Sequence, residues 1–157
     1  MIDNNESNQP KRKAKAGVRG VARLYAVQMM YRAEQEKCSV LKFAVRKKDA
    51  EIFLSEDLYL VDMDDEFYGN LIRITEKNLE EIDKQISDNL QKSWNLNRLD
   101  LVTKNILRLA TAELLFLTEI PKNVIFNEYI EIAKAFFDDK SEVSFVNGIL
   151  NKIAQQR

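Results

Sequence analysis

The stretch LDLVTKNILRLATAELLFL, residues 99–117, is the strongest indicator of fold class in this 157-residue chain. It contains no glycine or proline, and apolar side chains would cover more than half of its circumference if it were helical. A helix with so wide an apolar surface is normally enclosed by other elements. We therefore expect a central, largely buried helix beginning near Leu99, with an all-α bundle packed around it.

Apolar periodicity predicts further helices on both sides of this segment. The loop at residues 93–97 is the best candidate for a boundary between two helical halves. Pro121 should end the central helix and open the next one, and Ser141 is a plausible N-cap for the last. The chain should hold six or seven helices; those outside the central segment are expected from about residue 16, and over about residues 39–60, 67–90, 123–137 and 142–154.

Composition argues against enzymatic and metal chemistry. The chain has no histidine, and Cys38 is its single cysteine, so the commonest general base, the commonest metal ligand and any disulfide are missing. We expect no cofactor and no metal. The N-terminal segment MIDNNESNQP lacks the apolar core of a signal peptide, and no apolar run approaches the ~20 residues that span a bilayer. A cytoplasmic protein that does not enter the membrane is expected.

Positive charge is concentrated near the N-terminus, in KRKAKAGVRGVAR, residues 11–23, which holds six cations and no acidic residue. Residues 1–32 contain seven basic and two acidic residues, whereas the remainder contains 17 basic and 23 acidic ones. Lys15, Arg19 and Arg23 recur at steps of four and should form a stripe along one side of a helix. Like charges at this spacing repel, so the stripe favours a polyanion such as RNA or DNA over a merely solvated face. Gln28 and Tyr31, further along, add an amide and a ring that suit single-stranded RNA.

Two motifs near the C-terminus have a structural interpretation. Gly148 interrupts an otherwise periodic helix, and we expect it to let another helix approach closely rather than to contact a ligand. Asn127 and Glu128 lie one turn inside an expected helix start, where capping or pairing is more plausible than catalysis.

Three segments together resemble the NusB family of bacterial transcription antitermination factors. They are ARLYAVQMMY (residues 22–31), WNLNRLDLVTKNILRLATAEL (residues 94–114) and IPKNVIFNEYIEIAKAFFDDKSEVSFVNGILNKIA (residues 120–154). The resemblance implies an all-α, NusB-like bundle of two packed three-helix subdomains without enzymatic activity. It also implies binding of boxA RNA in ribosomal RNA leaders together with ribosomal protein NusE. That complex joins RNA polymerase and other Nus factors and prevents premature termination.

The resemblance also implies which side chains contact RNA. Its arginine-rich start corresponds here to Arg19 and Arg23 with Lys15 nearby, although Gly20 and Val21 stand where the family often has further arginines. The other implied contacts are Gln28, Tyr31, Phe136, Lys140 and Phe145.

The expected organisation is a flexible basic arm at residues 1–14 followed by one domain at residues 15–157. Within that domain the subdomains would cover about residues 15–92 and 96–155. Two other interpretations remain open. One is a module related to the N-terminal domain of RNA cytosine methyltransferases, and the other is a protein-interaction module that forms a homodimer.

Overall fold

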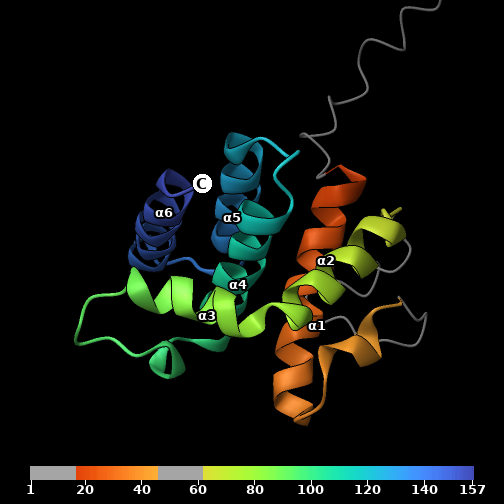
Figure 1. The fold of residues 1–157 in the computed structure, drawn as a ribbon, viewed down its shortest axis with the longest axis horizontal. Helices are drawn as coiled ribbons and strands as arrows, with labels where there is room; N and C mark the ends of the chain where they lie inside the picture. Colours follow the sequence, from red (N-terminus) through yellow and green to blue (C-terminus); the bar gives the residue numbers. More distant parts are fainter. Residues whose placement is uncertain (1–16, 46–61) are drawn as a thin grey trace, which may run out of the picture.

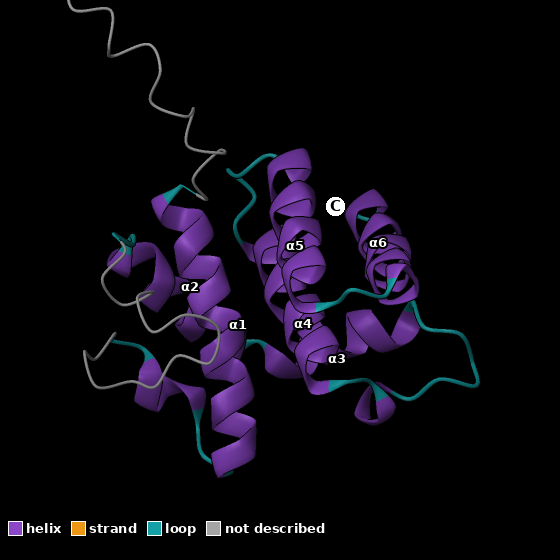
Figure 2. Cartoon of the chain, turned by 180° about the vertical axis from the view of Figure 1, so that it is seen from behind, coloured by secondary structure: helices purple, strands orange, loops and turns teal. Residues whose placement is uncertain are grey.

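The structure, a computed structural model, describes residues 17–45 and 62–157. In these two ranges all regular structure is helical, without strands, as Figures 1 and 2 show, which confirms the all-α expectation. No helix there is both long and apolar enough to cross a membrane. The elements are α1 (Val18–Glu36), η2 (Val40–Phe43), α2 (Asp65–Lys77), α3 (Leu79–Asp88), η4 (Leu96–Arg98), α4 (Leu101–Phe116), α5 (Lys122–Phe136) and α6 (Lys140–Gln155).

Helix α4 is the centre of the bundle, as expected. It packs against α1, α2, α3, α5 and α6, and in Figure 1 it lies between α1 and α2 on one side and α6 on the other. Every residue from Thr103 to Leu114 is buried. Because α4 contacts helices from both halves of the chain, it joins them into one core. The division into two three-helix subdomains stays a prediction.

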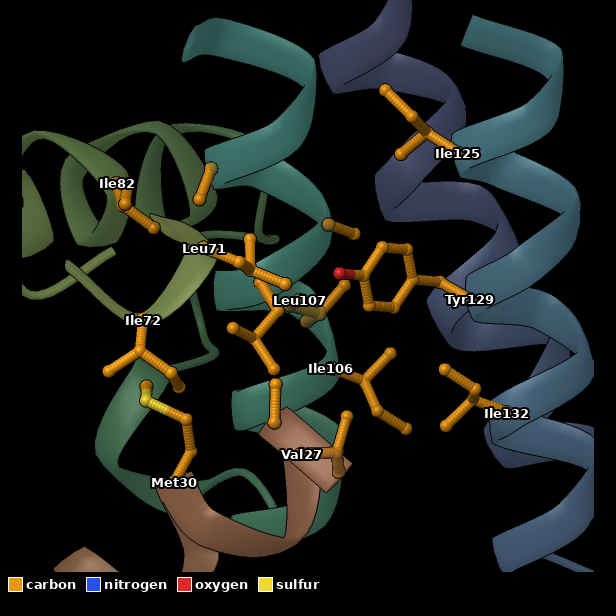
Figure 3. Close-up of a cluster of buried hydrophobic side chains, with 14 of the residues drawn as sticks. Val27, Met30, Leu71, Ile72, Ile82, Ile106, Leu107, Ile125, Tyr129 and Ile132 are labelled. Carbon is orange, nitrogen blue, oxygen red and sulfur yellow. The ribbon is translucent and has the colours of Figure 1, made fainter. Parts of the chain in front are cut away.

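The core consists mainly of aliphatic side chains with tyrosines among them. Figure 3 shows Tyr129 projecting from α5 toward Leu107 of α4, with Val27 of α1 nearby. Tyr129 and Leu107 have no exposed surface. Removing such side chains from water is the main favourable term in folding.

Two valines near the starts of helices are at the surface. Val18 is 44% exposed and Val124 is 43% exposed. Both lie in the first turn of a helix, α1 for Val18 and α5 for Val124. The other large apolar side chains of α5 are buried or half-buried.

The expected helix at 67–90 is in fact two helices, α2 and α3, separated at Asn78. The side-chain amide of Asn78 donates to the Ile74 carbonyl oxygen at 2.9 Å, and the Asn78 backbone amide donates to the same oxygen at 3.1 Å. Asp64 caps the start of α2 by accepting from the Phe67 amide at 2.9 Å. Apolar spacing continued through Asn78, so periodicity alone did not reveal this break.

Two other predicted elements differ from the structure. The helix expected at 39–60 is represented by η2, and residues 46–61 lie outside the described ranges. The N-cap of α6 is Asp139, which accepts from the Ser141 amide at 2.8 Å, and not Ser141. Both residue types cap well, and the chain uses the earlier one.

Candidate nucleic-acid interface

Arg23 is not part of an exposed stripe, which corrects the expectation for this residue. Its side chain is only 3% exposed and pairs with the fully buried carboxylate of Glu113 on α4. Arg23 Nε donates to Glu113 Oε2 at 2.9 Å, and Nη2 donates to Oε1 at 2.8 Å. The Tyr129 hydroxyl donates to the same carboxylate from α5. A buried carboxylate requires such partners, so Arg23 neutralises a charge in the core and does not face a ligand.

Burial and mutual contacts fix the protonation states of Arg23 and Tyr129, which with Glu113 form a buried trio. Burial disfavours the charged Arg23, but the hydrogen bond and the charge of Glu113 outweigh this effect and raise the pKa of Arg23 above its ordinary value. Burial first, and then the Glu113 charge, raise the pKa of Tyr129 well above 10.0. Tyr129 therefore remains a neutral donor. The trio ties α1 to α4 and α5 and thereby positions the later residues of α1.

Arg19, one turn earlier, does remain at the surface. Its side chain is 54% exposed, lies 4.8 Å above the Phe67 ring and is 3.5 Å from Asp64 at the start of α2. Lys15, the other predicted member of the stripe, lies outside the described residues.

The groove beside Arg19 is of mixed charge. It has a volume of about 450 Å³, and its lining holds two arginines and three carboxylates. The acidic side chains reduce the local attraction for phosphate. Among the described residues, Arg19 thus lies in a groove of mixed charge and not at the centre of a wholly basic surface.

Three predicted residues from distant parts of the chain meet at one cavity of about 270 Å³. Gln28 and Tyr31 come from α1, and Phe136 comes from the end of α5. Val27, Asp100 and Val102 complete the lining. Gln28 lies nine residues after Arg19, about two and a half helical turns, so the two side chains leave opposite sides of α1.

Asp100 and Val102 were not among the predicted site residues. Asp100 caps α4 by accepting from the Val102 amide at 2.9 Å and the Thr103 amide at 3.3 Å. An aspartate directly before a long apolar run is a recognisable helix-start signal. The sequence therefore contained the helix start, but not the proximity of that start to Gln28.

Lys140 and Phe145 lie on α6 and are not among the residues that line this cavity. Lys140 is the first residue of α6 and is exposed. Phe145 is half-buried against Trp94, with ring centroids 5.6 Å apart. Trp94, which is 49% exposed, was not predicted as a site residue. Its proximity to Phe145 depends on the loop between α3 and α4.

Gly148 does not mediate a close approach between helices, which corrects the expectation for this residue. A Cβ atom added to it would have no described atom within 4 Å, and the residue is exposed on α6. The glycine leaves the helix surface open at this point.

The sequence model of the NusB family matches residues 21–155. The chain belongs to the NusB family. It is 36% identical over 141 residues to the transcription antitermination protein NusB of Caulobacter vibrioides, a match that covers 87% of this chain and 92% of that protein.

Solved NusB structures share the fold. T. maritima NusB superposes with a TM-score of 0.70 at 34% identity, covering 88% of this chain and 91% of that one. A crystal structure of the antitermination factors NusB and NusE in complex with dsRNA matches with a TM-score of 0.69 at 28% identity. That match covers 89% of this chain and 98% of the other.

Proposed function

We propose that this NusB-family chain binds boxA RNA together with ribosomal protein NusE and so prevents premature termination by RNA polymerase. The observation that carries the proposal is the family match across residues 21–155. A related NusB has also been crystallised with NusE and dsRNA. The chain is a transcription antitermination factor, an adaptor rather than an enzyme. We place its action in the cytoplasm, with the transcription machinery.

The proposed RNA contacts divide by chemistry. Arg19 and Lys140 are exposed cations for phosphate groups, and Lys15 is retained as a proposal outside the described residues. Tyr31, Phe136 and Phe145 offer rings for base stacking, which contributes about 1–3 kcal/mol per base. Gln28 is the remaining proposed contact, through its amide. Arg23 acts indirectly, by holding α1 in place.

The proposal is tested by gel-shift titration of the full chain with boxA-containing and scrambled RNA, each with and without NusE. We expect tighter binding of the boxA RNA and a further gain when NusE is present. Equal affinity for both RNAs, with no effect of NusE, would refute the proposed function. A duplex of the same boxA sequence provides a third arm, because the related complex contains dsRNA.

The phosphate contribution is measured by the salt dependence of binding. For single-stranded RNA, each neutralised phosphate adds about −0.7 to the slope of log affinity against log salt. We expect Arg19→Ala to make the slope shallower by about that amount. Lys84→Ala is the matched control, since Lys84 is exposed on α3 and lines neither the cavity nor the groove beside Arg19. Equal slopes for the two variants would remove Arg19 from the interface.

A further inference from the structure

Two of the three carboxylates that line the groove beside Arg19 have no partner among the described residues. Asp64 is occupied, because it caps α2 and lies 3.5 Å from Arg19. Glu66 and Glu119 are both exposed, and neither makes a hydrogen bond or an ion pair within residues 17–45 and 62–157. Residues 62–66, DMDDE, place four carboxylates at this end of α2. The groove can therefore attract a cationic segment.

Glu119 reaches this groove from a different part of the chain, the loop between α4 and α5. Arg157 holds that loop, because its Nη2 atom donates to the carbonyl oxygens of Ile120 at 2.8 Å and Leu117 at 3.4 Å, on either side of Glu119. Carboxylates in the first turn of α2 stabilise that helix whatever they face. Glu119, in a loop, has no such role, so its position in the groove calls for a partner.

The most basic segment of the chain joins the described structure at the edge of the groove. Residues 11–15, KRKAK, contain four cations and no acidic residue, and they lie outside the described ranges. Helix α1 begins at Val18, whose carbonyl oxygen accepts the Asp64 amide at 3.1 Å, and the next residue, Arg19, lines the groove. Because a residue spans at most about 3.3–3.6 Å, Lys15 is tethered within about 7 Å of Gly17.

We propose that the groove between the starts of α1 and α2 and the α4–α5 loop is a docking site for the chain's own basic segment, residues 11–15. The segment and the groove are complementary in charge, with four cations facing the carboxylates of residues 62–66 and Glu119. Exposed ion pairs are individually weak, but the tether gives the segment a high effective concentration beside the groove.

Docking would place the cations of residues 11–15 in competition between the groove and RNA phosphates. The free protein would hold them against its own carboxylates, and only an RNA that makes enough other contacts would displace them. Weak, sequence-independent binding to RNA is thereby reduced. This consequence rests on the proposed RNA-binding function, whereas the docking itself does not.

Docking is tested on the full chain with a carbodiimide, which joins a carboxylate to a lysine amine in direct contact, followed by mass spectrometry. We expect bonds between a lysine of residues 11–15 and Glu66 or Glu119 at about 0.01 M salt, and far fewer at about 1 M salt, where charges are screened. Glu80 and Glu81, exposed in the first turn of α3, are the internal control and should form none.

A mixture of unlabelled and isotope-labelled protein identifies the occupant of the groove. Bonds confined to one isotope support docking within a chain. Bonds that join the two isotopes would mean that the segment docks on a second copy, and no bond to Glu66 or Glu119 would leave the groove to a different partner. Either of these results would overturn the inference.

The competition is measured through the affinity of the full chain for oligo(rU). We expect the double variant Glu66→Gln, Glu119→Gln to bind about fivefold more tightly than the double variant Glu80→Gln, Glu81→Gln, a factor that corresponds to two exposed ion pairs. Both variants remove two exposed glutamate charges, so they share any general change in the attraction for RNA. Equal affinities of the two variants would overturn the competition.

A third set of proteins links the gain to the basic segment. When Lys11→Gln, Lys13→Gln and Lys15→Gln are added to each double variant, the difference between the two should disappear. A difference that persists would mean that the groove carboxylates repel RNA directly, and would overturn the inference. If neither oligo(rU) nor boxA RNA binds the wild type, the proposed function fails, and the cross-linking result alone decides the docking.

Discussion

Arg19 and Arg23 show that the same side chain, one turn apart, can have unrelated roles. Arg19 is 54% exposed with a 3.5 Å contact to Asp64, whereas Arg23 is buried with three hydrogen bonds to Glu113. An exposed pair contributes little to stability, while breaking a buried pair costs about 3–5 kcal/mol because one charge is left uncompensated. Arg19 is therefore the candidate for RNA binding, whereas Arg23 stabilises the fold.

The buried Tyr129 predicts how stability depends on alkaline pH. Its pKa is raised in the folded protein, so its contribution is fully present below the unfolded-state value of about 10 and is lost as pH rises above that value. We expect the free energy of unfolding of the wild type to fall by up to about 1.4 kcal/mol per pH unit above pH ~10 on account of this residue alone.

Tyr129→Phe removes that contribution. The variant should be less stable at neutral pH, because Glu113 loses a donor, yet its stability should decline less steeply in alkali. Tyr68, whose pKa is also raised by burial, retains its own share of the decline in both proteins. Urea unfolding from pH ~8 to ~11 measures both slopes. Parallel curves would show that Tyr129 is not buried beside the Glu113 carboxylate.

Within the single helix α5, adjacent residues lie on an exposed and a buried face. Val124 is 43% exposed and its neighbour Ile125 is completely buried. We expect Ile125→Ala to lower the free energy of unfolding by about 2–5 kcal/mol and Val124→Ala to change it by no more than about 0.5 kcal/mol. Urea unfolding of the two variants provides the measurement, and each serves as the other's control. Comparable losses would contradict the orientation of α5.

The positions at which helices end were harder to predict than which side of each helix is buried. Asn78 divides α2 from α3 without a glycine or proline, and both its side chain and its backbone amide bond to the Ile74 carbonyl. Asparagine occurs both inside helices and at their ends, so its role depends on the neighbouring turn. Pro121, in contrast, was correctly predicted to separate α4 from α5, because proline restricts the backbone whatever its surroundings.

Across the whole molecule, ionic contacts join helices that are distant in sequence. Glu34 of α1 pairs with Lys104 at 2.9 Å and with Arg108 at 2.8 Å, both on α4. Arg108 also donates to both oxygens of Asp83 on α3, at 2.8 and 2.9 Å. This network orients three helices at once.

Arg157 makes a second long-range connection. Its Nη2 atom donates to the carbonyl oxygens of Ile120 at 2.8 Å, Leu117 at 3.4 Å, and Thr118. These oxygens lie where α4 ends and are not all satisfied within that helix. We expect Arg157→Ala to lower the free energy of unfolding by about 1–2 kcal/mol.

The control for this substitution is Lys152→Ala, which removes an exposed cation from the last turn of α6. It should change stability by no more than about 0.5 kcal/mol. Thermal or urea unfolding distinguishes the two. Equal effects would mean that the loss of charge, and not the loss of these carbonyl contacts, is responsible.

The amino-acid sequence alone was sufficient for the all-α class, the buried central helix and the resemblance to the NusB family. These depend on local features: apolar spacing within one helix and short motifs are readable without knowing what lies opposite. The same locality explains the assignment of Gln28, Tyr31 and Phe136 as site residues, which stays a prediction.

Whether an individual polar side chain is buried, paired or exposed depended on the assembled bundle. Arg23 is neutralised by Glu113, 90 positions away, and no local pattern could pair them. The cavity beside Gln28 exists only because α1, the start of α4 and the end of α5 meet. Helix periodicity is a property of neighbouring residues, whereas burial and charge compensation are properties of surfaces brought together by folding.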